Sequence, residues 1–191
     1  MSPEERAKKT RVLRTESELC RAAQHVSYEI NMLIHAGNEL GGFHSSPMST
    51  PGGNDKNIAL ESFLLHFRNL RAFLCPSLQL TTPDDVIASD FLQEIVPRDV
   101  VDPTVLSTDK QRLDKMLAHL SYSRRLFIDG GTHGWEVARM LALMLSQLEA
   151  FCTMLSAAHR NWFPDSEWIA KSKELAADFL LQGPIEGPKL E

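Results

Sequence analysis

Cysteine is scarce in this sequence of 191 residues, and the three that occur, Cys20, Cys75 and Cys152, lie far apart. No two of them form a CxxC pair, and their number is odd. These facts argue against a disulfide framework and against a zinc ribbon, because both need paired or closely spaced cysteines. Free thiols are typical of a reducing compartment, so we expect a cytoplasmic protein.

Uninterrupted apolar runs are also lacking. The most apolar stretch, residues 137–158, contains Arg139, Gln147 and Glu149. Because such side chains are costly in lipid, we expect a buried helix here and predict no membrane association. The charged N-terminus is not followed by an apolar segment, so no signal peptide is expected.

An excess of positive charge is absent as well. The formal net charge of −5 excludes a uniformly basic nucleic-acid-binding protein. Residues 1–15 nevertheless hold five basic and two acidic side chains, and we expect them to form a basic, flexible N-terminal arm. Residues 16–182 are predicted to form a single domain, since a chain of this length and 43% hydrophobic composition can bury a core. Residues 183–191 are expected to be a C-terminal tail.

No alternating strand pattern and no internal repeat is found, and apolar residues instead recur every three or four positions. This spacing predicts helices over about 16–40, 55–74, 108–126 and 166–181, and one that starts near 137 and is broken at 162–164. The predicted fold class is all-α: an antiparallel helical bundle of four long helices plus one or two short ones.

Local signals set the expected helix boundaries. Gly41-Gly42 is expected to end the first helix and Pro76 to stop the second. Thr82-Pro83-Asp84-Asp85 combines a capping hydroxyl, a proline and two acids, which predicts the start of a short helix reaching about Leu92. The remainder of the acidic segment 76–106 is expected to be irregular.

Standard catalytic and cofactor motifs are missing. The sequence contains no HExxH, no GxSxG and no dinucleotide-binding glycine pattern. Its seven histidines show no paired ligand spacing, and its carboxylates do not form the Glu-x-x-His repeats of di-iron bundles. We therefore expect neither a metal nor a cofactor.

The helix predicted over 108–126 holds the candidate catalytic residues, Arg112 and His119. Seven residues separate them, so on a helix they project within about 20° of each other and about 10 Å apart. Leu113 belongs to the apolar face, which places the pair beside the buried stripe. Imidazole exchanges protons near neutral pH and guanidinium grips phosphate, which together suffice for metal-free RNA cleavage. The alternative is a helix-flank histidine capping the core, with a surface arginine.

Further cationic and polar residues complete the predicted substrate-binding set. These are Lys115 and Tyr122 on the same helix and Arg68, Asn69 and Arg71 on the helix over 55–74. Arg71 falls inside an apolar sector, where it needs a partner if it is buried. That partner is either Glu61 or an acid from 84–94, or else Arg71 points into the same cleft as His119.

Two segments resemble uncharacterised bacterial α-helical proteins of the HEPN-like, abortive-infection or toxin type. They are ESFLLHFRNL at 61–70, and Lys115 to Tyr122, which contains Ala118-His119-Leu120-Ser121. Arg112-x6-His119 fits the signature of that superfamily, an arginine followed after four to six residues by a histidine. The resemblance implies a small, often dimeric α-bundle and a metal-independent endoribonuclease of a defence or toxin–antitoxin system. His119 would be its acid/base and Arg112 its phosphate-holding residue, in a site where two protomers meet.

Two hypotheses of function follow. One is a ribonuclease that cuts or binds RNA in a cleft lined by Arg112, His119 and the cationic side chains of the helix over 55–74. The other is a non-catalytic helical module that dimerises or holds a partner protein, such as an antitoxin. A homodimer is predicted in both, because the helix that starts near 137 is apolar on both sides.

Overall fold

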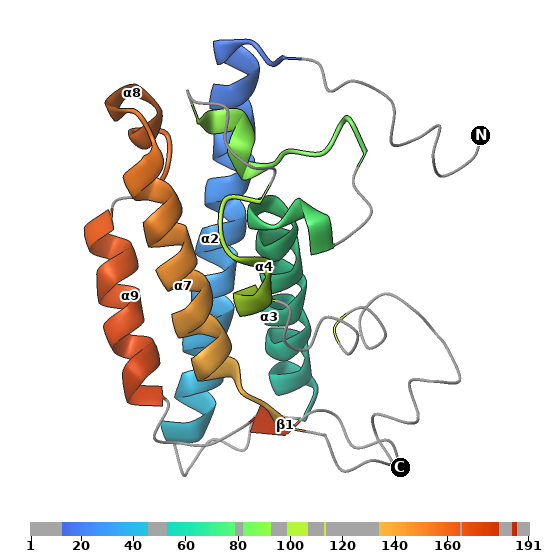
Figure 1. Ribbon diagram of the computed structural model, residues 1–191. Helices are drawn as coiled ribbons and strands as arrows, with labels where there is room; N and C mark the ends of the chain where they lie inside the picture. The colour runs from blue at the N-terminus through green and yellow to red at the C-terminus, as the bar shows by residue number, and fades with distance from the viewer. Residues whose placement is uncertain are drawn as a thin grey trace, which may run out of the picture.

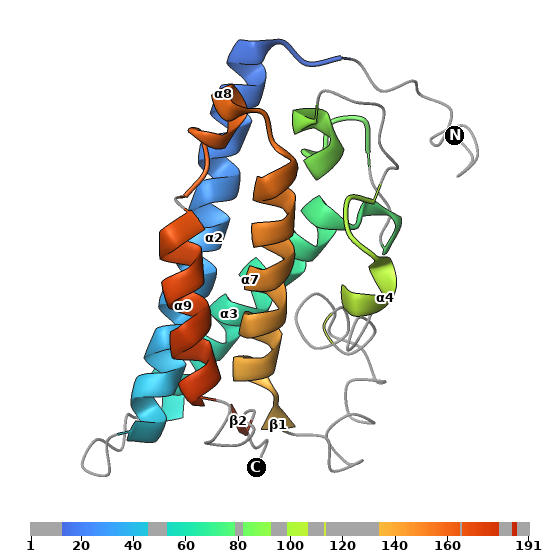
Figure 2. The ribbon, with the colours of Figure 1, turned by 60° about the vertical axis from the view of Figure 1, so that its left-hand side comes forward.

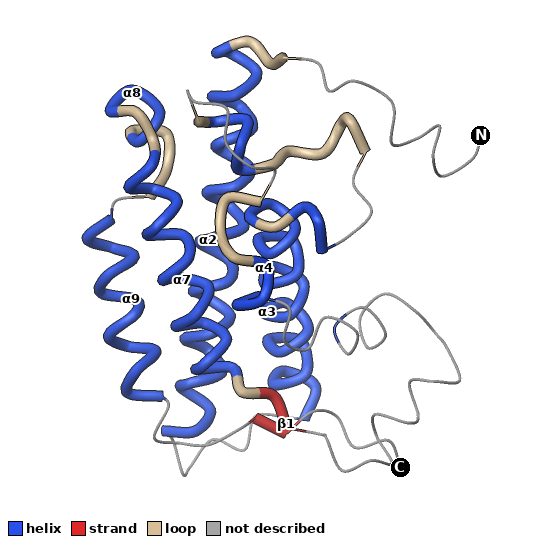
Figure 3. Tube along the Cα trace, viewed as in Figure 1, coloured by secondary structure: helices blue, strands red, loops and turns tan. Residues whose placement is uncertain are grey.

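The computed structural model describes residues 13–45, 53–78, 82–92, 99–106, 113, 134–164, 166–179 and 185–186. Within these residues the fold is almost entirely helical, which confirms the all-α class (Figure 1 and Figure 3). The longer helices are α2 (Glu16–Ser45), α3 (Gly53–Leu74), α7 (Val137–Met154) and α9 (Ser166–Phe179). The shorter ones are α4 (Pro103–Leu106), α8 (Ala157–Arg160) and the 3-10 turns η1 (Pro76–Leu78) and η2 (Ala88–Phe91).

Helix α7 lies at the centre of the arrangement. It packs against α2, α3 and α9, while α2 and α3 pack along each other and α9 also contacts α2. Figure 2 shows α9 running beside α7 on the side away from α4. In Figure 1, α2 and α9 run downward whereas α3 and α7 run upward, so α2 and α3 are antiparallel and so are α7 and α9, but α3 and α7 run in the same direction.

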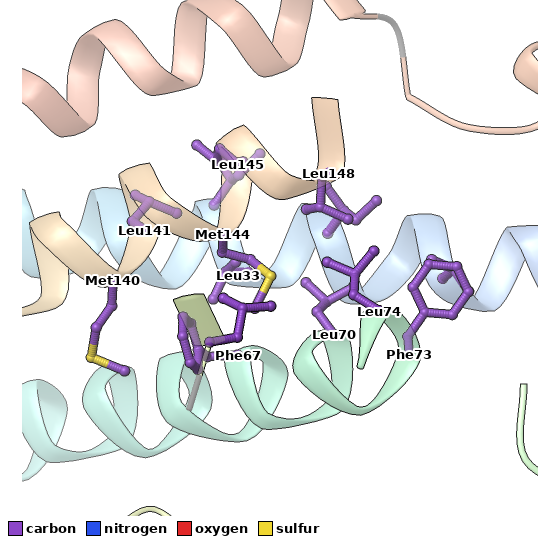
Figure 4. Close-up of a cluster of buried hydrophobic side chains, with 14 of the residues drawn as sticks. Leu33, Phe67, Leu70, Phe73, Leu74, Met140, Leu141, Met144, Leu145 and Leu148 are labelled. Carbon is purple, nitrogen blue, oxygen red and sulfur yellow. The ribbon is translucent and has the colours of Figure 1, made fainter. Parts of the chain in front are cut away.

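The core forms where α7 meets α2 and α3. Figure 4 shows its central layer, in which side chains of α7 and α3 gather between these two helices, with α2 behind them. The labelled residues are Leu33, Phe67, Leu70, Phe73, Leu74, Met140, Leu141, Met144, Leu145 and Leu148, and each is at most 6% exposed. Burial on this scale is the main favourable term in folding.

A glycine allows α2 and α7 to approach closely. A Cβ atom added at Gly37 would lie 2.8 Å from Cδ2 of Leu141, closer than side chains pack. The side chain of Leu141 therefore occupies the space that a side chain at position 37 would need.

The second apolar side of α7, on which the homodimer prediction rests, is only partly covered within one chain. Met140 is buried, whereas Ala150 and Met154 are exposed. Helix α9 approaches another face of α7, where Nζ of Lys173 lies 2.6 Å from Oε2 of Glu149. By length and hydropathy α7 could also cross a membrane, but half of that stretch is buried inside the protein. The homodimer stays a prediction.

A two-residue strand pair is present although no strand is predicted. β1 (Gly134–Trp135) pairs antiparallel with β2 (Ile185–Glu186), so part of the predicted C-terminal tail belongs to the fold. A ladder of two residues is too short to leave an alternating pattern in the sequence. Trp135 is 1% exposed, and its burial anchors this end of the protein.

The ends of α2 and α7 differ from the prediction. α2 continues past Gly41-Gly42 to Ser45, because glycine weakens a helix by about 1 kcal/mol without forbidding it. α7 ends earlier than predicted, at Met154. Leu155 is extended, with φ −70° and ψ 145°, and the Oγ atom of Ser156 then caps α8 by accepting from the backbone N–H of His159 at 3.2 Å.

The segment 82–92 is a turn followed by η2 rather than the predicted α-helix. The carboxylate of Asp85 accepts from the backbone N–H of Thr82, which closes a turn in place of a helix start. Ile87 is then extended, with φ −128° and ψ 152°, which interrupts any continuous helix. Further on, Pro103–Leu106 forms one helical turn inside a segment predicted to be irregular.

Helix α2 starts at Glu16, close to the predicted position, and a capping box formed by Thr15 and Glu18 stabilises this start. The carboxylate of Glu18 accepts from the backbone N–H and the hydroxyl of Thr15, both at 2.8 Å, and the N–H of Glu18 donates back to Thr15 Oγ1 at 3.3 Å. These hydrogen bonds hold the pKa of Glu18 below its ordinary value.

Removing this cap is expected to lower stability. Thr15→Ala should reduce the melting temperature by about 3 °C near neutral pH, while Ser17→Ala in the same turn should leave it nearly unchanged. Because the folded-state pKa of Glu18 is lowered, its contribution is present above the ordinary glutamate pKa and is lost as pH falls. Melting curves should therefore show the Thr15→Ala deficit shrinking in acid, and a deficit that grows would contradict this.

Candidate functional site

The predicted catalytic residues Arg112 and His119, with Lys115 and Tyr122, lie outside the described residues. That the side chains of Arg112 and His119 lie together in one site therefore stays a prediction. Leu113 is described, and it is helical and fully buried, which confirms that this position belongs to the core face.

The three predicted substrate-binding residues of α3 have different surroundings. Arg71 is 1% exposed, so a nucleic acid on the surface cannot reach its guanidinium in this conformation. Asn69 donates from Nδ2 to Oε2 of Glu29 at 3.0 Å, which ties α3 to α2. Arg68 is half-buried on the same helix and is also engaged in an interaction. The structure does not gather these three side chains in one open site.

A carboxylate–imidazole pair at the α2–α3 seam was not predicted. Nδ1 of His66 lies 2.7 Å from Oε2 of Glu29, the same oxygen that accepts from Asn69. His66 is 6% exposed, and the ring of Tyr28 meets it edge-on at 5.9 Å. Neither of the two hollows described below includes these side chains, so the pair acts as a link between helices.

The larger hollow is a groove of about 180 Å³ between the first turns of α2 and the segment 82–92. These two segments lie at the same end of the molecule (Figure 1). The groove is lined by Arg14, Glu18, Leu19, Ala22, Asp84, Asp85, Val86 and Asp90. We call it the α2 groove.

Polar bonds hold the two walls of the α2 groove together. Nη2 of Arg14 donates to the carbonyl of Pro83 at 2.7 Å, which joins the start of α2 to the opposite wall. His159 bonds both walls: its Nδ1 lies 2.7 Å from the Phe91 carbonyl and its Nε2 lies 3.2 Å from Oε1 of Glu16. These hydrogen bonds fix the positions of the two walls relative to each other.

An aromatic cluster fixes the 82–92 wall to the core. The ring of Phe91 meets the rings of Phe73, Phe151 and Phe163 in edge-on contacts, with centroids 5.2 to 6.4 Å apart. Phe91 is fully buried. Such contacts add to the burial of the rings and restrict their orientation.

The lining of the α2 groove is acidic and partly apolar. Its lining includes four carboxylates, from Glu18, Asp84, Asp85 and Asp90, against one arginine. The carboxylates of Glu18, Asp85 and Asp90 also accept hydrogen bonds from nearby backbone N–H groups, whereas Asp84 is exposed.

Three apolar side chains, those of Leu19, Ala22 and Val86, share the lining. Val86 is 39% exposed, which is high for a side chain of this type. An apolar surface beside fixed negative charge suits a ligand that is itself both apolar and cationic.

The second hollow is much smaller, about 20 Å³, and has room for about one water molecule. Its lining residues are Phe67, Val105, Leu106, Glu136, Arg139, Met140 and Leu143. It offers no space for an organic ligand.

The described residues contain no group of three or more side chains suited to hold a metal ion. Burial raises the pKa of the Cys75 thiol to about 12 and that of Cys152 to about 11. Both thiols are therefore protonated at neutral pH and lack the thiolate that acts as a nucleophile.

Comparison with known proteins gives no assignment: no protein-family model matches the chain, and neither do any curated proteins or any solved structures. The HEPN resemblance has no support from these comparisons.

Proposed function

We propose that this protein is a non-catalytic helical module, built as an antiparallel bundle, that binds a partner protein through the α2 groove. The partner segment that fits is cationic and partly apolar. The observation that carries the proposal is the groove itself, a hollow whose lining combines four carboxylates with three apolar side chains. A homodimer remains part of the proposal, and sedimentation that finds only monomer at micromolar concentration would contradict that part.

Lysine and arginine side chains match both parts of the α2 groove. Their aliphatic stems can cover Leu19, Ala22 and Val86, while the charged head reaches Asp84. Exposed ion pairs contribute at most about 1 kcal/mol each, so several contacts are needed and affinity should be modest. The net charge of −5 favours the approach of a cationic partner and makes binding sensitive to salt.

A direct experiment uses a fluorescent peptide of alternating lysine and leucine and measures anisotropy on titration with the protein. Binding is expected at low ionic strength and should weaken strongly at high salt. A peptide of alternating glutamate and leucine is the matched control and should not bind. Equal binding of both peptides, or no binding of the lysine peptide at low salt, would overturn the proposal.

The ribonuclease hypothesis is separated from this proposal by an RNA degradation assay without metal, comparing wild type with His119→Ala. A binding module is expected to leave RNA intact in both cases. Cleavage by wild type that disappears in His119→Ala would instead support catalysis by Arg112 and His119 and would overturn the non-catalytic part of the proposal.

A further inference from the structure

We propose that the basic segment 1–12 of the same chain occupies the α2 groove and competes there with a partner protein. The inference rests on the proposed function, because it gives the same groove an occupant from within the chain. Residues 1–12 lie outside the described residues. Their sequence, the point at which they join α2 and the lining of the groove carry the inference.

The chain enters the described structure at the edge of the α2 groove. Leu13 is the first described residue, and it is 95% exposed. The next residue, Arg14, already lines the groove, and its guanidinium donates to the Pro83 carbonyl of the opposite wall at 2.7 Å. Residues 1–12 are therefore attached beside the groove, and one cationic side chain next to them already lies against the 82–92 wall.

The segment is long enough to lie along the groove. The lining residues of α2 extend from Arg14 to Ala22, which is about 12 Å along the helix axis. An extended chain covers up to about 3.5 Å per residue, so about four residues before Leu13 span the same distance. Lys9 and Arg11 are therefore within reach of both walls when the chain turns back along α2.

The charges of the segment and of the groove are complementary. Residues 1–12 hold four basic and two acidic side chains, whereas the groove lining holds four carboxylates and one arginine. Asp84 directly follows Pro83, to which Arg14 is bonded, and Asp84 is exposed. A cationic side chain of the segment therefore has an accessible carboxylate close to the point of attachment.

The segment also carries apolar surface. Ala7 and Val12 flank the cationic residues 8–11, and lysine and arginine add their aliphatic stems. The groove offers matching apolar side chains, among them Val86, which is 39% exposed. Residues 1–12 thus combine positive charge with apolar surface, which is the combination that the proposed function requires of a partner.

Covalent attachment makes even weak binding effective. A short tethered segment is present at an effective concentration of about 1 mM. If the segment binds with a dissociation constant of about 0.3 mM, it occupies the groove in about three quarters of the molecules. A partner that needs the empty groove then binds about fourfold more weakly than it would without this competition.

The location of the segment is tested without any peptide. Backbone amide shifts are compared by nuclear magnetic resonance between wild type and the double variant Lys9→Gln, Arg11→Gln at low ionic strength. Differences are expected on both walls of the groove, at Ala22 and Val86, because the substitutions release the segment. Differences confined to the residues next to Leu13 would overturn the inference.

The matched control is the double variant Arg139→Gln, Lys171→Gln. These exposed cationic residues lie on α7 and α9, outside the groove lining, and their substitution changes the net charge equally. The control should leave the amide shifts of the groove unchanged. Groove differences that grow with protein concentration would indicate the segment of a second copy and would overturn occupancy within one chain.

Competition is tested with the lysine–leucine peptide. The variant Lys9→Gln, Arg11→Gln should bind the peptide about fourfold more tightly than the variant Arg139→Gln, Lys171→Gln. Equal binding by the two variants would overturn the competition and leave the proposed function intact. Absence of peptide binding in both variants would overturn the proposed function and the competition with it, and the amide shifts would then still decide whether residues 1–12 occupy the groove.

Discussion

Phe91→Ala is expected to destabilise the protein by about 3–5 kcal/mol, because it removes a fully buried ring from the centre of the aromatic cluster. Phe73, Phe151 and Phe163 all lose their contact with the 82–92 wall at once. For a chain of this length the loss corresponds to about 10 °C in melting temperature. Denaturant unfolding of the variant beside wild type measures it.

Two matched variants separate burial from other effects. Phe91→Leu keeps most of the apolar volume and should cost below about 1.5 kcal/mol. Val86→Ala lies in the same segment but is partly exposed, and it should stay within about 0.5 kcal/mol of wild type. If Phe91→Ala proved as mild as Val86→Ala, the 82–92 wall could not be held against the core as described.

Asp84→Lys is expected to weaken binding of the lysine–leucine peptide about tenfold. Asp84 is an exposed carboxylate of the α2 groove, and the substitution replaces attraction of a cationic head by repulsion. Stability should barely change, since exposed substitutions have small effects. Anisotropy titration at low salt measures the affinity and a melting curve checks the fold.

The control for Asp84→Lys is Glu61→Lys. Glu61 is also exposed, but it lies on α3 and is not part of the groove lining. Both variants change the net charge equally, so a purely long-range charge effect would weaken binding to the same extent in each. The proposal expects Glu61→Lys to bind nearly as wild type does, and equal losses would contradict it.

The long helices could be predicted because their apolar stripes are the same stripes that the core buries. Leu60, Phe63, Phe67, Leu70 and Leu74 of α3 are each at most 2% exposed, and the helix ends before Pro76 as predicted. Helix α7 was predicted to continue too far because its apolar spacing persists through Leu155, which is buried although the backbone there is extended. The periodicity of apolar residues in a sequence indicates which residues are buried, but it does not determine the backbone conformation of each residue.

Turns and short pairings could not be predicted in the same way. The sequence from Thr82 to Asp85 is compatible with a turn as well as with a helix start, because the same side chains can accept backbone hydrogen bonds in both. In the structure the Asp85 carboxylate accepts from the Thr82 N–H and closes a turn. The strand pair joins residues about fifty positions apart with two residues on each side, and local sequence carries no sign of it.

The α2 groove was missed because it depends on contacts between distant segments. Arg14 meets Pro83 across 69 positions, and His159 meets Glu16 across 143. Two features of the sequence could have indicated the groove: the acidic composition of residues 76–106 and the apolar residue Val86 within that segment. The sequence drew attention instead to Arg112 and His119, where spacing on a single helix is easy to recognise.

Mapping of backbone amide shifts by nuclear magnetic resonance, during titration with the lysine–leucine peptide, tests the location of binding most directly. The largest changes are expected at Leu19, Ala22, Val86 and Asp90, which face the groove from its two walls. Changes confined to α9, or spread evenly over all exposed acidic residues, would contradict a partner site in the α2 groove.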